Sequence, residues 1–299
     1  EDQSQVEVLA NQGTQDPSTR VGKVARALLL ESPVGQAAGY GIALVLAFVS
    51  NAVQVADAGM YGVEILGAVA LSATNVALAA SVMYSLRKAA VAGRLGSETY
   101  RRLNLGLFAN SLTAVVFILR HAIFFSPGAL QVVVLANLLT AIVCLRIWSV
   151  SVRHENRNVA IAALVGVRRT FASLAGAVRP RNGTSLIYAV LFWLLASISG
   201  GAMFLPSPSQ LSSGAPLVAA IRLWAAQQGF LHGAVLYSLK DASDRGRLSA
   251  STFRNLNLGL AVTFTLRSVI QGLVAMIVSL AIAVFGFYNY VFTATRPSS

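Results

Sequence analysis

Acidic residues and cysteine are scarce in this chain of 299 residues. Only 11 residues are Asp or Glu, against 23 Lys and Arg, and charged residues make up 11% of the total. The acidic residues fall in the polar N-terminal stretch, in loops or at the ends of apolar runs, so no carboxylate pair is placed inside an apolar run for acid–base chemistry or proton relay. The single cysteine, Cys144, offers no disulfide framework.

Sequence motifs for catalysis and metal binding are also missing. There is no His-Glu-x-x-His zinc motif, no Gly-x-Ser-x-Gly nucleophile motif, no phosphate-binding loop and no dinucleotide-binding glycine motif. The three histidines, His121, His154 and His232, are too scattered in sequence to indicate a metal cluster. We therefore predict that the chain is not an enzyme and has no metal site, and the sequence identifies no cofactor.

What the chain has in abundance is hydrophobic sequence. Hydrophobic residues make up 56% of the chain, and the mean hydropathy is +0.66. A membrane-spanning helix needs about 20 mostly apolar residues, and several runs reach that length without an interior charge. The sequence therefore predicts an all-α integral membrane protein. The first six expected spans are residues 35–55, 65–86, 103–125, 129–150, 186–205 and 216–239.

The last apolar stretch, residues 256–292, leaves the number of spans open. Its 37 residues are few for two full spans at about 1.5 Å rise per residue. We predict a short or kinked seventh helix that turns near Gln271-Gly272 into an eighth. The alternative is one long tilted helix, which would give seven spans instead of about eight.

A long sequence element occurs twice. Residues 84–107 and 237–260 are identical at 14 of 24 positions, with a constant offset of 153 residues. In each copy an apolar run ends at Tyr-Ser-Leu, a Gly-Arg-Leu segment follows, and another apolar run begins with Leu-Asn-Leu-Gly-Leu. This pattern predicts a tandem duplication, with the repeated element forming a loop between two membrane segments. The matched residues that we single out are Tyr84, Arg94 and Asn104 in the first copy, and Tyr237, Arg247 and Asn257 in the second.

The duplication predicts four regions. Residues 1–33 form a polar N-terminal arm, 34–150 the first four-helix repeat, 151–184 a basic linker and 185–299 the second four-helix repeat. The arm is expected to follow a removed leader or a trimmed end. Because an even number of spans in each copy brings both copies into the membrane from the same side, we expect two parallel repeats related by an axis along the membrane normal.

Basic residues gather on one side of the expected spans. They occur in the N-terminal arm, around residues 87–102, in the linker and around residues 240–254, whereas the loop between the first two spans carries only Asp57 and Glu64. Such loops lie on the non-translocated side of a membrane. We expect the cations to contact anionic lipid headgroups. Nucleic acid is not an expected partner, because no reading module accompanies the positive charge.

The location is less constrained than the topology. Only three of the 23 basic residues are lysine, and this bias, together with the polar arm, favours an organelle membrane of a chloroplast or mitochondrion.

Three arginines fall within or beside apolar runs, where a charge is costly unless it pairs, meets water or reaches the headgroups. They are Arg120, Arg222 and Arg267. One interpretation makes them contacts for an anion or an acidic lipid headgroup. The structural interpretation, which we favour, is that Arg120 reaches the membrane surface and Arg267 pairs with a neighbouring group.

Two functions are consistent with this pattern. The first is a non-catalytic polytopic subunit or scaffold of a larger membrane protein complex, which binds other membrane subunits and lipids. The second is a transporter or channel for an anionic solute, with the three arginines along its path. The first needs fewer unseen features and is our preferred prediction.

Overall fold

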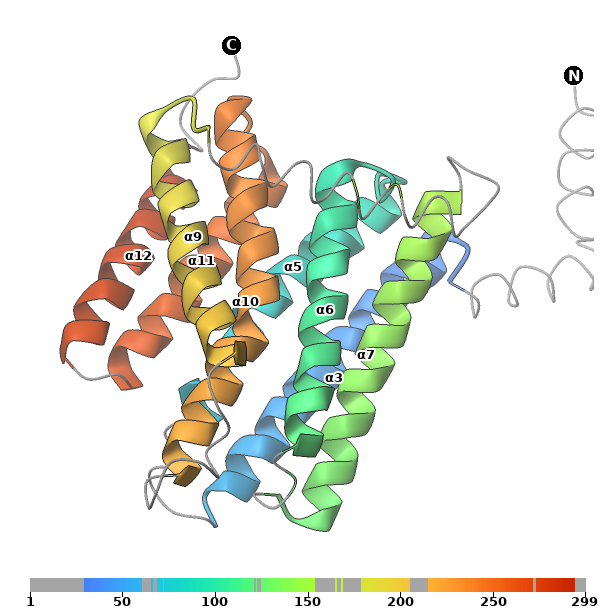
Figure 1. The fold of residues 1–299 in the computed structure, drawn as a ribbon. Helices are drawn as coiled ribbons and strands as arrows, with labels where there is room; N and C mark the ends of the chain where they lie inside the picture. Colours follow the sequence, from blue (N-terminus) through green and yellow to red (C-terminus); the bar gives the residue numbers. More distant parts are fainter. Residues whose placement is uncertain are drawn as a thin grey trace, which may run out of the picture.

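The computed structural model describes residues 30–60, 73–120, 125–153, 179–204, 215–270 and 273–293, with isolated positions 66, 69–71, 122, 165 and 168. Within these ranges the chain is helical and contains no strand (Figure 1). The helices are α3 (Pro33–Ala58), α5 (Asn75–Val91), α6 (Glu98–Arg120), α7 (Pro127–Arg153), α9 (Gly183–Phe204), α10 (Ala215–Asp244), α11 (Ser251–Ile270) and α12 (Leu273–Phe292). Most of the expected arm and linker lie outside the described residues.

Four helical stretches in the described part of the chain are long and apolar enough to cross a membrane. They are Pro33–Ala58, Val69–Val91, Pro127–Ser151 and Ala275–Phe292. The surfaces of these helices are apolar too, since only 28% of the most apolar window of α3 and 33% of that of α7 are buried inside the bundle. Helices that expose their apolar side chains are typical of a protein in contact with lipid. The count of eight spans remains a prediction.

Local sequence explains where several helices begin. The Ser32 hydroxyl accepts a hydrogen bond from the Gly35 amide at 3.0 Å, and Pro33 occupies the first turn of α3, where its missing amide hydrogen costs nothing. Helix α7 begins at Pro127, in the gap between the third and fourth expected spans. The amide of Ser126 donates to the Asp57 carboxylate at 3.0 Å, which ties the end of α3 to the start of α7.

The last apolar stretch forms two helices. Helix α11 ends at Ile270 and α12 begins at Leu273, and the predicted turn at Gln271-Gly272 lies outside the described residues. The two helices pack extensively against each other. The single long tilted helix is therefore excluded.

The helices form two halves that interlock. The first half consists of α3, α5, α6 and α7, and the second of α9, α10, α11 and α12. The main contacts between the halves are made by α10 on α6 and by α11 on α5 (Figure 1). The second helix of each half thus packs on the third helix of the other. Within each half these two helices, α5 and α6 or α10 and α11, touch each other only sparingly.

Candidate functional site

Glycine makes the two crossings between the halves possible. A Cβ atom on Gly106 of α6 would lie 2.4 Å from the Cβ of Ala234 on α10, and one on Gly259 of α11 would lie 2.0 Å from the Oγ of Ser81 on α5. These separations are shorter than van der Waals contact, so a larger residue would push the helices apart. Gly259 follows Gly106 by 153 residues, and Ala234 follows Ser81 by the same offset. The two crossings therefore use equivalent positions.

The two Gly-Arg-Leu segments form matching turns. Gly93 has φ of 63° and Gly246 has φ of 64°, a left-handed conformation that glycine adopts without strain. The amide of Arg94 donates to the Ala89 carbonyl at 2.8 Å, and the amide of Arg247 donates to the Ala242 carbonyl at 2.8 Å. Both arginine side chains are exposed.

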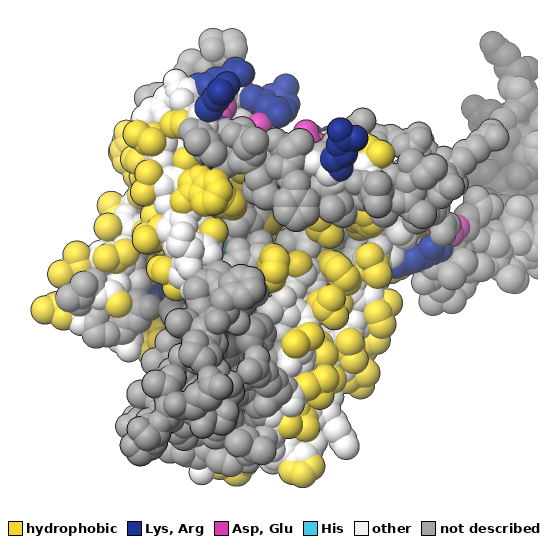
Figure 2. Space-filling view, viewed as in Figure 1, with side chains coloured by type: hydrophobic (Ala, Val, Ile, Leu, Met, Phe, Trp, Pro, Cys, Tyr) yellow, Lys and Arg dark blue, Asp and Glu magenta, His cyan; other side chains and the backbone are white. Residues whose placement is uncertain are grey.

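The turns lie at one end of the bundle, which we call the basic end. It comprises the turns at 92–97 and 245–250, the last turn of α7 and the start of α9. Most of the Lys and Arg side chains visible in Figure 2 gather there, above a surface rich in apolar side chains. The first turn of α6, which follows the 92–97 turn, is joined to the last turn of α7, because Arg101 donates to the Ser151 carbonyl at 2.9 Å.

One contact at the basic end joins the two halves through Arg102. Its guanidinium carbon lies 4.1 Å from the centre of the Tyr237 ring, and its nitrogens lie 2.9 Å from the Glu98 carboxylate and 3.9 Å from that of Asp241. The side chain is 7% exposed. Arg102 was predicted to be one of the cations in the basic loops. In the structure its side chain is buried and packs between the two halves. Tyr237 is buried, whereas its counterpart Tyr84 is 46% exposed.

The second half also contains a buried ion pair at the basic end. The ammonium of Lys240 lies 2.6 Å from the Asp244 carboxylate, with the two side chains 6% and 9% exposed. Burial alone would raise the pKa of Asp244, but hydrogen bonds from Lys240 and from the Arg181 amide together hold that pKa below its ordinary value. The corresponding first-half positions are Arg87 and Val91, so the pair is specific to the second half.

The repeated asparagines lie inside the bundle and bridge helices. The Asn104 side-chain amide of α6 donates to the Cys144 carbonyl of α7 at 3.0 Å. In the second half, the Tyr188 hydroxyl of α9 donates to the Asn257 side-chain oxygen of α11 at 2.6 Å.

Of the three arginines that the sequence places in or beside apolar runs, Arg267 has its side chain in the described part of the structure. It is 2% exposed and donates to Thr74 at 3.2 Å and to Asn75 at 2.5 Å, at the start of α5. Its guanidinium carbon also lies 4.6 Å from the centre of the Phe264 ring. Two of the three predicted anion contacts, the side chains of Arg120 and Arg222, lie outside the described part of the chain.

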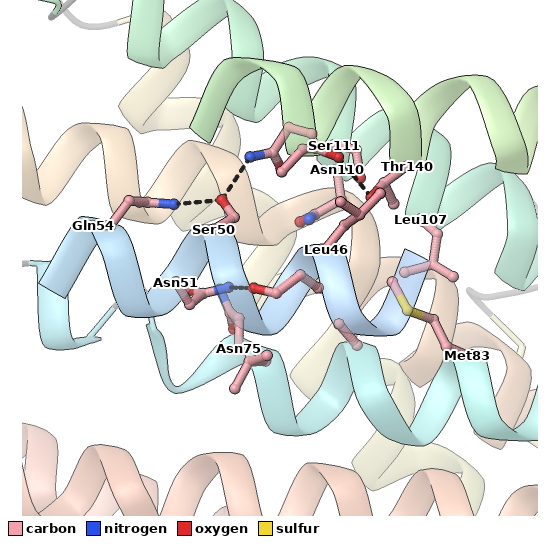
Figure 3. A pocket seen from close by; sticks show the side chains of 15 residues that line it. Leu46, Ser50, Asn51, Gln54, Asn75, Met83, Leu107, Asn110, Ser111 and Thr140 are labelled. Carbon is pink, nitrogen blue, oxygen red and sulfur yellow. Dashed lines mark hydrogen bonds between the residues drawn. The ribbon is translucent and has the colours of Figure 1, made fainter. Parts of the chain in front are cut away.

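Asn75, which accepts a hydrogen bond from Arg267, also lines a polar cavity in the first half. The cavity has a volume of about 40 Å³ and is bounded by α3, α5, α6 and α7 (Figure 3). On α3, Ser50 accepts hydrogen bonds from Gln54 at 3.1 Å and from Asn137 of α7 at 3.0 Å. The polar side chains that line it are Ser50, Asn51, Gln54, Asn75, Asn110, Ser111, Asn137 and Thr140.

Our sequence interpretation missed this cavity, because its polar residues carry no charge and are spread along four helices. An available signal was that asparagine and glutamine inside apolar runs are costly unless they bond to another helix. Asn51, Gln54, Asn75, Asn110 and Asn137 all occur in such runs. Sequence spacing does not reveal that they meet.

Two glycines on α10 explain the close approach of α9. A Cβ on Gly229 would lie 2.5 Å from the Cβ of Ser199, and one on Gly233 would contact the Phe192 ring at 3.4 Å. His232 lies between them, 1% exposed, with its ring edge-on to Phe264 at 5.8 Å between centroids. The described residues contain no group of three or more His, Cys, Asp or Glu side chains that could hold a metal ion.

No protein-family model matches this chain, and no curated protein matches it in sequence.

Proposed function

We propose that this protein is a non-catalytic polytopic subunit or scaffold of a larger membrane protein complex. It would consist of two parallel four-helix repeats, with the basic end on the non-translocated side of an organelle membrane. The observation that carries the proposal is the pair of tight glycine crossings between the halves, Gly106 on Ala234 and Gly259 on Ser81.

The crossings favour a scaffold because of where transporters place their substrates. In transporters built from repeats, the substrate site lies at the interface between repeats, near the middle of the membrane, and is formed by interrupted helices. Here helices α6 and α11 are continuous through the crossings, and side-chain atoms fill the contact. The polar cavity is bounded by first-half helices and does not lie between the halves.

The surface supports association with partners in the membrane. Large apolar side chains are exposed along α3, α7, α9 and α12, including Phe48 at 52%, Leu135 at 57%, Trp193 at 47% and Phe287 at 56%. Such surfaces accept either lipid chains or the helices of another subunit. Isolation from the native membrane distinguishes the two cases, because a companion subunit would be recovered together with the chain.

The test is isolation of the full chain from its native membrane in a mild detergent, followed by native mass spectrometry. The expected result is a complex with a fixed set of companion subunits. A lone chain or a homo-oligomer after isolation would overturn the scaffold proposal.

The basic end supports a role in binding anionic headgroups. Arg94 and Arg247 are exposed at equivalent turns, and a cation near a membrane surface strengthens binding to anionic lipid by about fivefold. Arg94→Gln combined with Arg247→Gln should weaken the retention of phosphatidylglycerol during delipidation. Arg245→Gln is the matched control, because Arg245 already pairs with Asp241 at 3.0 Å. Equal losses in both variants would contradict this part of the proposal.

Transport of an anion remains the second candidate, since a buried guanidinium, Arg267, is bonded to a residue that lines the polar cavity. Anion flux into liposomes that contain the purified chain tests this function. Flux that is lost in Arg267→Gln but kept in Arg87→Gln, an exposed control on α5, would favour transport over the scaffold role.

A further inference from the structure

The polar cavity of the first half has the dimensions of a site for a very small ligand. Its volume is about 40 Å³. A buried water needs about 10–15 Å³ of such space, so the cavity holds about three waters at most. Larger organic solutes do not fit.

Two atoms on the cavity wall lack a hydrogen-bond partner in the described structure. They are the side-chain nitrogen of Asn75 on α5 and the side-chain oxygen of Asn110 on α6. Asn75 is 8% exposed, and its oxygen is already bonded to Arg267. A buried polar atom without a partner is unfavourable, so a ligand that bonds to both of these atoms would stabilise the protein. One needs an acceptor and the other needs a donor.

The wall favours a neutral ligand over an ion. Its lining residues include no Asp, Glu, Lys, Arg or His. Two other donors on the wall already bond to their own helices, since the Asn51 amide bonds to the Ala47 carbonyl at 2.7 Å and the Thr140 hydroxyl bonds to the Ala136 carbonyl at 2.8 Å. An ion would need several groups of one polarity, whereas one donor and one acceptor suit a molecule that does both.

We infer that this cavity is a binding site for a cluster of about one to three ordered water molecules. The cluster bonds to Asn75 on one side and to Asn110 on the other. It thereby connects α5 to α6, two helices that make few direct contacts with each other. The cavity is lined by residues of a single chain, so the cluster does not require a partner subunit to complete its site.

Two sulfur side chains make the inference testable. Met83 is 2% exposed and lines the cavity, whereas Cys144 is fully buried and does not line it. A short X-ray pulse splits bound water into hydroxyl radicals, which oxidise sulfur side chains beside that water. The experiment is pulsed radiolysis of the full chain in lipid nanodiscs, with oxidation at each position measured by peptide mass spectrometry.

We expect Met83 to be oxidised at least tenfold faster than Cys144. Asn110→Leu, which fills the cavity and removes one anchoring atom, should reduce the Met83 rate to that of Cys144. Ala79→Val fills the same space from α5 without removing a polar group and should act in the same direction. Thr263→Leu is the control, because position 263 is the second-half counterpart of 110 and lies outside the cavity.

Slow oxidation of Met83 in the unaltered protein, equal to that of Cys144, would overturn the inference. So would fast oxidation that persists in a well-folded Ala79→Val or Asn110→Leu variant, since the radicals would then arise elsewhere. Slow oxidation in the unaltered protein overturns the inference even if both variants fail to fold.

Discussion

The two halves of this protein share their crossing geometry but differ in what fills their interiors. The first half surrounds a polar cavity, whereas the second packs aromatic rings, such as Tyr188 against Phe285 at 5.0 Å between centroids. Ser111 on the cavity wall corresponds to Phe264, which is 153 residues later and 4% exposed. The glycine crossings therefore constrain where the halves touch, while each interior has its own chemistry.

Substitution of the glycines at the two crossings has the largest expected effect on the free energy of unfolding. The loss should be similar at both crossings. Gly106→Ala and Gly259→Ala should each lower the free energy of unfolding by about 1–3 kcal/mol, because each added methyl overlaps a neighbouring helix. Thermal unfolding in detergent measures the loss. Gly41→Ala is the control, since nothing lies within 4 Å of a Cβ at that position.

A second substitution sharpens the test of the crossings. Ala234→Gly should restore the stability of Gly106→Ala, and Ser81→Gly should restore that of Gly259→Ala, because each removes the atom that the new methyl meets. Rescue at one crossing but not at the other would show that the two are not equivalent.

Arg267 tests a difference between the halves, since the residue 153 positions earlier on α6, Ala114, is small and buried. Arg267→Met should cost about 1.5–3 kcal/mol of unfolding free energy, because hydrogen bonds from a charged group are lost and the Asn75 oxygen loses its donor. Arg87→Met, at an exposed site on α5, should change stability by less than about 0.5 kcal/mol. Equal effects in chemical denaturation would contradict the buried role of Arg267.

The two buried tyrosines give a smaller contrast. Tyr188→Phe should lower unfolding free energy by about 1 kcal/mol, because the hydroxyl bonds to Asn257. Tyr40→Phe should have almost no effect, since the Tyr40 hydroxyl has no hydrogen-bond partner in the described structure. A loss of the same size at both positions would indicate that Tyr40 bonds in solution as well.

The smallest expected effect concerns pH. The pKa of Asp244 lies below its unfolded value of about 3.9, so its stabilisation is present above about pH 4 and is lost as pH falls through the lower, folded-state pKa. Asp244→Asn should be less stable than the unaltered protein at pH 7 and should lose less stability on acidification. Melting temperatures between pH 3 and 7 would measure this, and parallel curves for the two proteins would contradict it.

Sequence reasoning located most helices well but not all of their ends. The expected first and fourth spans, residues 35–55 and 129–150, fall within α3 and α7. The second span was expected at residues 65–86, and the structure has an apolar helical stretch at Val69–Val91, which continues past the expected C-terminal end. Apolar length indicates a helix reliably, but it does not set the end, because capping residues and contacts with neighbouring helices do so.

The candidate sites were less predictable than the helices. Arg267 attracts notice in the sequence because a charge in an apolar run is costly. Its partners on α5 precede it by more than 190 residues, and no spacing rule joins them. Arg102 illustrates the reverse case, since it reads as a surface cation and is buried against Tyr237.

The sequence alone determined the all-helical class, the association with a membrane and the matched elements 153 residues apart, because these follow from composition, apolar length and local identity. Only the tertiary structure decided that Gly106 and Gly259 are crossing points and that uncharged polar residues of α3, α5, α6 and α7 surround one cavity. The physical reason is that helix packing depends on which faces meet across long sequence separations, and the period of a single helix does not specify its partner.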